Sequence, residues 1–156
     1  MMIRFMLLAG IAFCAMEGVS YLAHRFVYHK LLWVFHRSHH QPRNGLFEWN
    51  DIFPLFFSSV CIVLMYIAVQ EPNGQDLLAL AVGTAMYGTV YFFIHDLYVH
   101  RRARWLTFRI PYLQRVKKAH MIHHLYGGEP YGLLVFPLPR RLRGKKDALA
   151  DVEISS

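Results

Sequence analysis

Two long stretches of the chain contain no charged residue. Residues 52–69 and 77–94 are runs of 18 residues without Asp, Glu, Lys or Arg, close to the ~20 apolar residues that cross a bilayer as a helix. A third apolar run, residues 5–23, contains one charged residue, Glu17. The pattern predicts an all-α, integral membrane helical bundle with three long spans. Three buried helices of a soluble domain are the alternative.

Shorter apolar patches follow at residues 105–113 and 131–139, where prolines interrupt them. They predict at most a fourth short or re-entrant span. The N-terminal run has no A-x-A-like cleavage site before the first histidine motif, so we expect it to be a span and not a cleaved signal peptide. We expect a single membrane-embedded domain over residues 1–140 and a charged, flexible C-terminal tail at 141–156.

Basic residues lie almost entirely outside the predicted spans. Of the 17 Lys and Arg, four lie in residues 25–50 and twelve after residue 96, whereas the connector 71–76 contains only acidic charges. By the positive-inside rule, segment 25–50 and the C-terminal third face the cytoplasm. The two cysteines, Cys14 and Cys61, fall inside predicted spans, away from any metal-binding spacing, and are expected to be packing residues.

The ten histidines are confined to two windows with the same internal spacing. Each window reads H-x4-H and then H-x2-H-H, with a gap of six residues in the first window and nineteen in the second. The first window contains His24, His29, His36, His39 and His40, and the second contains His95, His100, His120, His123 and His124. Such clustering predicts two half-sites in a cytoplasmic histidine-rich cap at the ends of the spans, although any one of these histidines alone would be an ordinary surface residue.

Helical geometry indicates how these histidines could converge. Residues i, i+3 and i+4 share a face of an α-helix, so each H-x2-H-H trio can direct three imidazoles to one point. Residues i and i+5 lie about 140° apart on an α-helix, so each H-x4-H pair should flank a centre. Neutral imidazole binds Fe, Zn, Cu or Ni. Five imidazoles on each of two octahedral ions would leave about one open position per ion, which suits O₂.

Four segments together resemble a known family. They are "AMEGVSYLAHRFVYH", "WVFHRSHHQPRNGLFEWND", "YFFIHDLYVHRR" and "AHMIHHLYGGEPYGLLVFP", which extend from about residue 16 to 137. Their order and spacing resemble bacterial β-carotene hydroxylases, within the fatty acid hydroxylase and sterol desaturase superfamily. Sterol and fatty-acid members usually have H-x3-H in the first block, whereas H-x4-H in both halves resembles the carotenoid branch. The segment "GGEPYGLLVFP" departs from the family pattern. This departure leaves the histidine motifs intact and bears only on which substrate is recognised.

The resemblance implies an activity and its requirements. It implies a non-haem di-iron monooxygenase of the bacterial inner membrane, with its active site on the cytoplasmic side. Two iron ions and O₂ would hydroxylate the β-ionone rings of a carotenoid at C3 and C3′, converting β-carotene through β-cryptoxanthin to zeaxanthin. It further implies a ferredoxin-type electron donor and contact with membrane lipid, and no nucleic-acid partner is expected.

Several non-histidine residues are candidates for supporting roles. Acidic residues near the histidines could accept a hydrogen bond from a ligating imidazole, namely Glu17, Asp96 and Glu129. Asn50 and Asp51 are expected to act mainly as helix caps, and Gly127 and Gly128 to end the helix of the second trio. Aromatic residues of the third span could line a channel for the polyene, namely Tyr87, Tyr91 and Phe92.

Two other functions remain open. The same di-iron centre could act on a sterol, a fatty acyl chain or another carotenoid, as a desaturase, ketolase or hydroxylase. A non-catalytic metal-binding or haem-binding membrane protein is the second alternative. A transporter should have several polar residues within its spans, and a bis-histidine haem protein should have histidine pairs inside them. The histidines here lie at or beyond the predicted span ends, which disfavours the second alternative.

Overall fold

The computed structural model describes residues 1–43, 45–103, 105–107 and 109–135, which form helices and loops without a β-strand. The predicted tail at 141–156 lies outside this described part. The chain divides into two compact units, residues 1–90 and 91–156.

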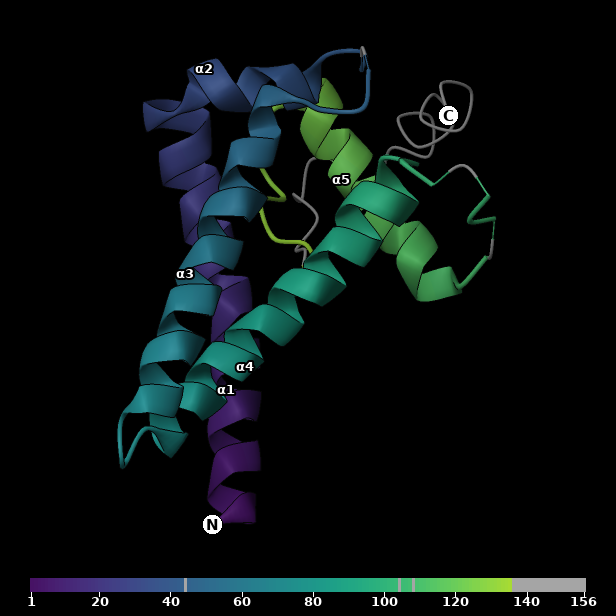
Figure 1. The fold of residues 1–156 in the computed structure, drawn as a ribbon. Coiled ribbons are helices and arrows are strands. Elements are labelled where there is room, and N and C mark those ends of the chain that lie inside the picture. The colour runs from purple at the N-terminus through teal and green to yellow at the C-terminus, as the bar shows by residue number, and fades with distance from the viewer. Residues whose placement is uncertain (44, 104, 108, 136–156) are drawn as a thin grey trace. The chain divides into compact units, whose positions relative to one another are not determined.

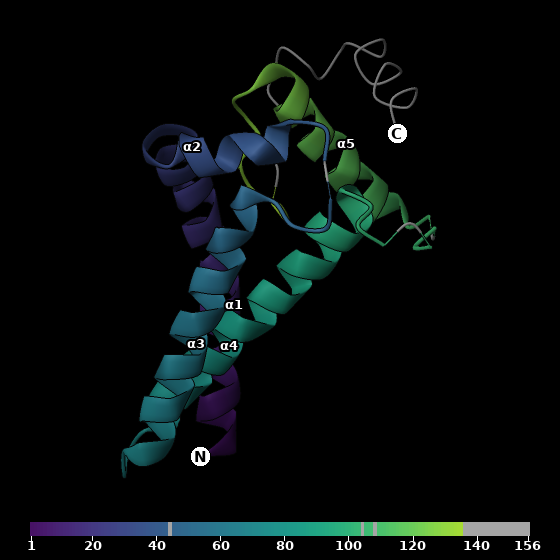
Figure 2. The same ribbon diagram turned by 45° about the horizontal axis from the view of Figure 1, so that its top comes forward.

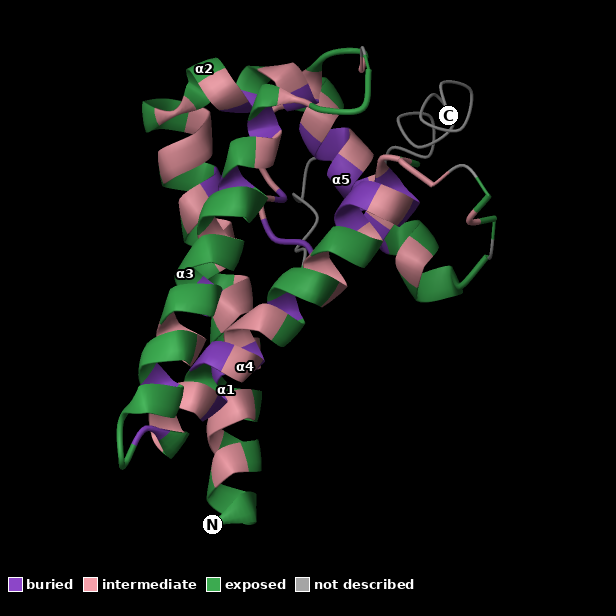
Figure 3. Cartoon of the chain, viewed as in Figure 1, coloured by how far each residue is buried: buried purple, intermediate pink, exposed green. Residues whose placement is uncertain are grey.

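Three helices in the described part are long and apolar enough to cross a membrane, as predicted. They cover Met2–Leu31, Trp49–Gln70 and Gln75–Val99. Little of their surface is buried by the protein itself: only 6%, 17% and 22% of the three apolar windows is buried. Figure 3 shows this for α3, whose residues are mostly exposed. Apolar side chains exposed along a whole helix are suited to contact with lipid.

The first unit contains these helical elements in order: α1 (Met2–Leu22), the π-helix η1 (Ala23–Leu31), α2 (Trp33–His36), the 3₁₀-helices η2 (Arg37–His40) and η3 (Trp49–Asp51), α3 (Ile52–Gln70) and most of α4 (Gln75–Tyr91). α1 and α4 lie side by side in both views (Figures 1 and 2). At their closest approach, a Cβ added to Gly83 would lie 2.9 Å from Ala12 Cβ and would overlap the Ala9 carbonyl group. Glycine and alanine thus permit close backbone contact, as is common between membrane helices.

Polar contacts join α1 and α4 as well. The Tyr87 hydroxyl donates a hydrogen bond to Glu17 Oε2 at 2.7 Å, and the Tyr87 ring meets Phe13 edge to face at 5.7 Å. Near the start of both helices, Arg4 forms an exposed ion pair with Asp76. The polar contacts of Arg4 and Glu17, which lie 13 residues apart along α1, therefore join the two helices at two points along their length.

The second unit contains the π-helix η4 (Phe92–Val99), which continues α4, and α5 (Pro111–Tyr126). Its core consists of Tyr98, Val99, Val116 and Leu133. Pro111 begins α5, and Gly127 ends it with φ +61°, as predicted from the glycine pair. No fourth span is found in the described residues: those of 105–110 are not helical, and α5 is too short and too polar to qualify.

Candidate metal centre

Four histidines of the first unit converge through their ring nitrogens. His24 and His29 lie on η1, His36 ends α2, and His40 ends η2. The Nε2 of His24 lies 3.1 Å from that of His36 and 3.2 Å from that of His29, and the Nε2 of His40 lies 3.3 Å from that of His36. The four nitrogens all lie within 4.8 Å of one another. Two of the four side chains, His24 and His36, are buried.

Four histidines of the second unit converge in the same way. His95 lies on η4, His100 follows η4 directly, and His120 and His124 lie one turn apart on α5. The Nε2 of His120 lies 3.0 Å from that of His100 and 2.8 Å from that of His124. The ring of His95 is centred 4.6 Å from the ring of His120. Each half of the sequence therefore forms a four-imidazole cluster inside its own unit.

Both H-x4-H pairs lie on π-helices, which the sequence did not predict. In η1 the Leu32 N–H donates to the Val27 carbonyl at 2.8 Å, and after η4 the His100 N–H donates to the His95 carbonyl at 3.0 Å. A ladder that connects residues five apart brings i and i+5 to the same side of the helix. The expected separation of about 140° holds for an α-helix and is wrong here, because the helix changes type where the histidines begin. The two imidazoles of each pair adjoin each other and do not flank a centre.

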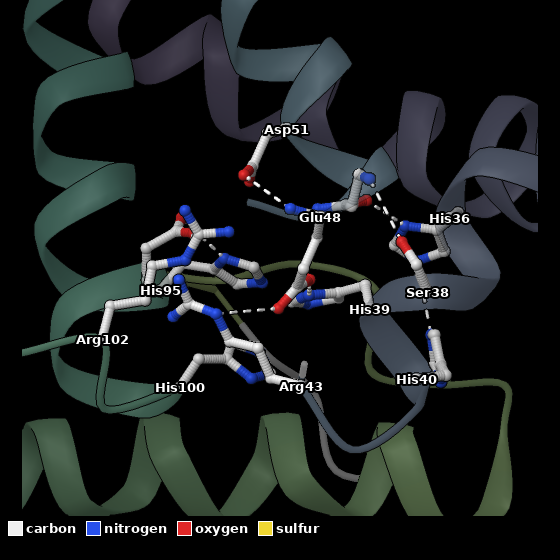
Figure 4. A network of polar contacts seen from close by, with 12 residues as sticks. His36, Ser38, His39, His40, Arg43, Glu48, Asp51, His95, His100 and Arg102 are labelled. Carbon is white, nitrogen blue, oxygen red and sulfur yellow. Dashed lines mark hydrogen bonds and ion pairs between the residues drawn. The ribbon is translucent and has the colours of Figure 1, made fainter. Parts of the chain in front are cut away.

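The Nδ1 atoms of two cluster histidines are held by oxygen atoms. His36 Nδ1 donates to Asn50 Oδ1 at 2.7 Å, and His95 Nδ1 lies 3.1 Å from Asp96 Oδ2. A neutral imidazole with its proton on Nδ1 has its lone pair on Nε2, the atom that faces the other histidines. Asp96 thus has the contact expected of it. Asn50 was expected to be a cap, but the capping box is formed by Glu48 and Asp51 (Figure 4).

The middle histidine of each trio has a different environment from its neighbours. His39 Nδ1 lies 3.5 Å from Glu48 Oε2, and His123 Nδ1 donates to the Gly128 carbonyl at 2.6 Å. Both imidazoles are buried. Burial lowers the pKa of His123, more than the Gly128 hydrogen bond and nearby Glu129 raise it. In these trios, i and i+4 join the cluster of their own unit, whereas the Nδ1 atom of i+3 lies beside a separate oxygen atom.

The spacing of the nitrogens fits a metal ion. With metal–nitrogen bonds of about 2.1 Å, adjacent ligands of an octahedral ion lie about 3 Å apart and opposite ligands about 4.2 Å apart. The Nε2–Nε2 separations of 2.8 to 3.3 Å match the adjacent distance. Each close contact needs a proton or a metal ion between the two nitrogens, and several nitrogens that converge on one point are suited to sharing one metal ion. Iron, zinc, copper and nickel all accept such ligands.

The other candidates occupy varied positions. Glu17 and Tyr87 bind each other between α1 and α4, as described above. The ring of Tyr91 is centred 4.8 Å from that of His95, whereas Phe92 is exposed. Glu129 accepts a hydrogen bond from the Tyr131 N–H at 3.3 Å and stabilises the charged form of His123 electrostatically.

Sequence reasoning missed Glu48 and the two arginines that contact the carboxylates. Arg43 Nε lies 3.5 Å from Glu48 Oε1, and Arg102 Nε lies 3.1 Å from Asp96 Oδ1. Figure 4 shows the Glu48 carboxylate between Arg43 and His39, and it shows Arg102 beside His95. Glu48 was recognisable as an acidic residue within the second family-like segment. The arginines had no comparable signal, because basic residues are common in both loops.

Comparison with known proteins identifies the family. Residues 9–142 match the family described as fatty acid hydroxylase. The chain belongs to the fatty acid hydroxylase family. No solved structure matches this family member significantly.

Curated relatives within the family are named as carotene hydroxylases. The chain is 42% identical to the β-carotene hydroxylase of Pseudescherichia vulneris over 117 residues, which cover 73% of this chain and 64% of that protein. It is 35% identical to the β-carotene hydroxylase of Pantoea ananas, covering 84% of this chain and 77% of the relative. It is 37% identical to the chloroplastic β-carotene 3-hydroxylase 2 of Arabidopsis thaliana, covering 90% of this chain and 48% of the relative. The chain thus spans about two thirds of the first relative and about half of the plant protein.

Proposed function

We propose that this protein hydroxylates the β-ionone rings of a carotenoid at C3 and C3′, converting β-carotene through β-cryptoxanthin to zeaxanthin. The observation that carries the proposal is the pair of four-imidazole clusters in a chain 35% to 42% identical to two bacterial β-carotene hydroxylases. The ring C3 methylene is neither acidic nor adjacent to the ring double bond, so acid–base chemistry cannot activate it. A metal-dependent oxidation of the C–H bond is required.

The proposed metal centre consists of two iron ions held by the ten histidines. Each four-imidazole cluster would hold one ion, and His39 and His123 would supply further ligands. When bound, the iron supplies the redox chemistry that activates O₂. The overall reaction inserts one oxygen atom into the C–H bond and releases the other as water, consuming two electrons and two protons. We assign the electrons to a ferredoxin-type donor.

The protein's own residues orient the ligands and the substrate. Asn50 and Asp96 hold the Nδ1 protons of His36 and His95, which directs Nε2 to the proposed ion. The Gly128 carbonyl holds the Nδ1 proton of His123, and Glu129 is proposed to act on the same imidazole through its negative charge. Glu17 lies seven residues before His24. It would support the centre indirectly, through the hydrogen bond that it accepts from Tyr87. Tyr87, Tyr91 and Phe92 are proposed to border the path of the polyene.

The substrate's insolubility suits a membrane location. A carotenoid dissolved in the bilayer would reach the centre along the three spans, with lipid as the surrounding solvent. We propose that the protein lies in the bacterial inner membrane as one domain, with its histidine-rich cap on the cytoplasmic side. A fourth short or re-entrant segment remains part of this proposal. The basic residues of segment 25–50 and of the chain after residue 96, together with the acidic connector 71–76, support this orientation through the positive-inside rule.

Expression in a bacterium that accumulates β-carotene tests the proposal. The expected result is conversion to β-cryptoxanthin and zeaxanthin, detected by chromatography and mass. A variant with alanine at His24 and His120 serves as the inactive control. Unchanged β-carotene, with the protein in the membrane fraction and iron in the medium, would refute the carotenoid activity.

The same centre acting on a sterol or fatty acyl chain is the second candidate, favoured by the family description itself. Lipid extracts of the same cells distinguish the two. A new hydroxylated or unsaturated acyl chain or sterol, with unchanged carotene, would support this candidate, and a ring ketone would indicate a ketolase. A non-catalytic metal-binding or haem-binding protein would yield none of these products.

A further inference from the structure

Arg102 contacts Asp96 with both its side chain and its backbone. Arg102 Nε lies 3.1 Å from Asp96 Oδ1, and the Arg102 N–H donates to the Asp96 carbonyl at 3.0 Å. The other carboxylate oxygen, Oδ2, lies 3.1 Å from His95 Nδ1. The two charged side chains are only 16% and 11% exposed. One buried carboxylate therefore connects a guanidinium group to an imidazole of the second cluster.

The backbone is bent so that Arg102 can make this contact. The preceding residue, Arg101, has φ +51°, in the left-handed region that usually favours glycine. The π-helical ladder ends with the bond from His100 to His95, and the next residue reverses the chain toward Asp96. A non-glycine residue in this conformation has its Cβ close to the following carbonyl oxygen, which is unfavourable. Such a conformation persists where surrounding contacts stabilise it.

We propose that Arg102 is a positioning residue that aligns His95 through Asp96. A carboxylate that contacts only an imidazole can rotate about its own bond, whereas a guanidinium group on its second oxygen fixes the carboxylate plane. The fixed carboxylate holds the His95 Nδ1 proton, and His95 Nε2 then faces His100 and His120. This inference rests on the proposed metal centre and adds a residue that none of the histidine motifs contains.

The first unit has a parallel arrangement with longer distances. Arg43 and His39 contact opposite oxygens of Glu48, both at 3.5 Å. The order arginine, carboxylate, imidazole is therefore repeated in the two units. The contacts around Asp96 are 0.4 Å shorter, by subtraction of 3.1 Å from 3.5 Å, so we expect the larger effect on the second unit.

Cobalt binding by the purified, metal-free protein in detergent tests the inference without relying on turnover. Co²⁺ is titrated into wild type, R102Q, D96N, the double variant D96N/R102Q, and R109Q, and visible absorption reports the imidazole-bound ion. We expect R102Q to lower the affinity for one of the two bound Co²⁺ ions about tenfold. R109Q, at an exposed arginine of the same loop, should bind as wild type.

The double variant separates positioning from general stability. If Arg102 acts through Asp96, D96N/R102Q should bind Co²⁺ no more weakly than D96N alone, because the effects of residues acting in series do not add. The inference would be overturned if R102Q bound Co²⁺ as tightly as wild type does. It would also be overturned if the loss of Co²⁺ affinity in the double variant equalled the product of the losses in the two single variants. If R102Q does not yield folded protein, R102K replaces it, with a smaller loss expected and equal affinity counting against the proposal. A wild type that binds no Co²⁺ would refute the metal centre itself.

Discussion

Gly83 should be the most sensitive position in the contact between α1 and α4. An added methyl group would lie 2.9 Å from both Ala12 Cβ and the Ala9 carbonyl carbon, and closer still to the Ala9 oxygen. Carbon atoms pack best at about 3.5–4.0 Å. Gly83→Ala therefore requires the two helices to move apart. The same helix offers a matched control, because a Cβ at Gly88 meets no atom within 4 Å.

The two substitutions have opposite expected signs. Alanine is favoured over glycine inside a helix by about 1 kcal/mol, and both variants gain this term. Overpacking costs about 1–3 kcal/mol, and only Gly83→Ala incurs it. The difference in stability between the two variants isolates the packing cost at about 1–3 kcal/mol, whatever the exact helix propensity in detergent.

Unfolding in detergent, followed by circular dichroism, measures this difference. We expect a lower midpoint for Gly83→Ala than for Gly88→Ala, and a midpoint for Gly88→Ala at or above that of wild type. Wild-type retention time on size exclusion would confirm that each variant folds. Equal midpoints for the two variants would refute the close contact of α1 and α4 at Gly83.

The remaining predictions concern a hydroxyl group, two thiols, the ten histidines and the pKa of one buried imidazole. Tyr87→Phe removes the hydrogen bond to Glu17 without opening a cavity, so the same unfolding assay should report a loss of about 0.5–1.5 kcal/mol; wild-type stability would contradict the bond. Cys14→Ser and Cys61→Ser should retain carotene hydroxylation, whereas alanine at any of the ten histidines should lower product formation at least about tenfold; full activity in several histidine variants would argue against the metal centre. Burial holds the pKa of His123 below its ordinary value of 6.5. The unfolded state therefore binds more protons just below that pH, so metal-free protein should lose stability as the pH falls through about 6.5. His123→Asn should reduce this slope in melts between about pH 5.5 and 7.5, and an unchanged slope would assign the effect to other groups.

The spans and the second trio were predictable from sequence because each depends on a local property. A run of 18 uncharged residues identifies a membrane helix whatever its neighbours are. His120 and His124 adjoin because α5 is a regular α-helix, in which residues four apart share a face. The repeated spacing also predicted two half-sites of five histidines each, one in each half of the sequence.

The partners of the histidines were harder to predict, because they depend on loop conformation. Asn50 contacts His36 across 14 positions of sequence, and the caps of η3 are supplied instead by Glu48 and Asp51. Arg102 reaches Asp96 only because Arg101 adopts a left-handed conformation that its side chain does not favour. Likewise, nothing in the sequence distinguishes Gly83, at the helix contact, from Gly88, which faces open space.

The π-helical segments have a consequence for comparing relatives whose histidine motifs differ in spacing. A wider coil absorbs one extra residue between two stacked side chains, so H-x4-H on η1 is the geometric counterpart of H-x3-H on an ordinary α-helix. An insertion of one residue between paired ligands can therefore be compensated by a local change of helical pitch. Spacer length alone is a poor criterion for deciding whether a distant homologue has lost its metal.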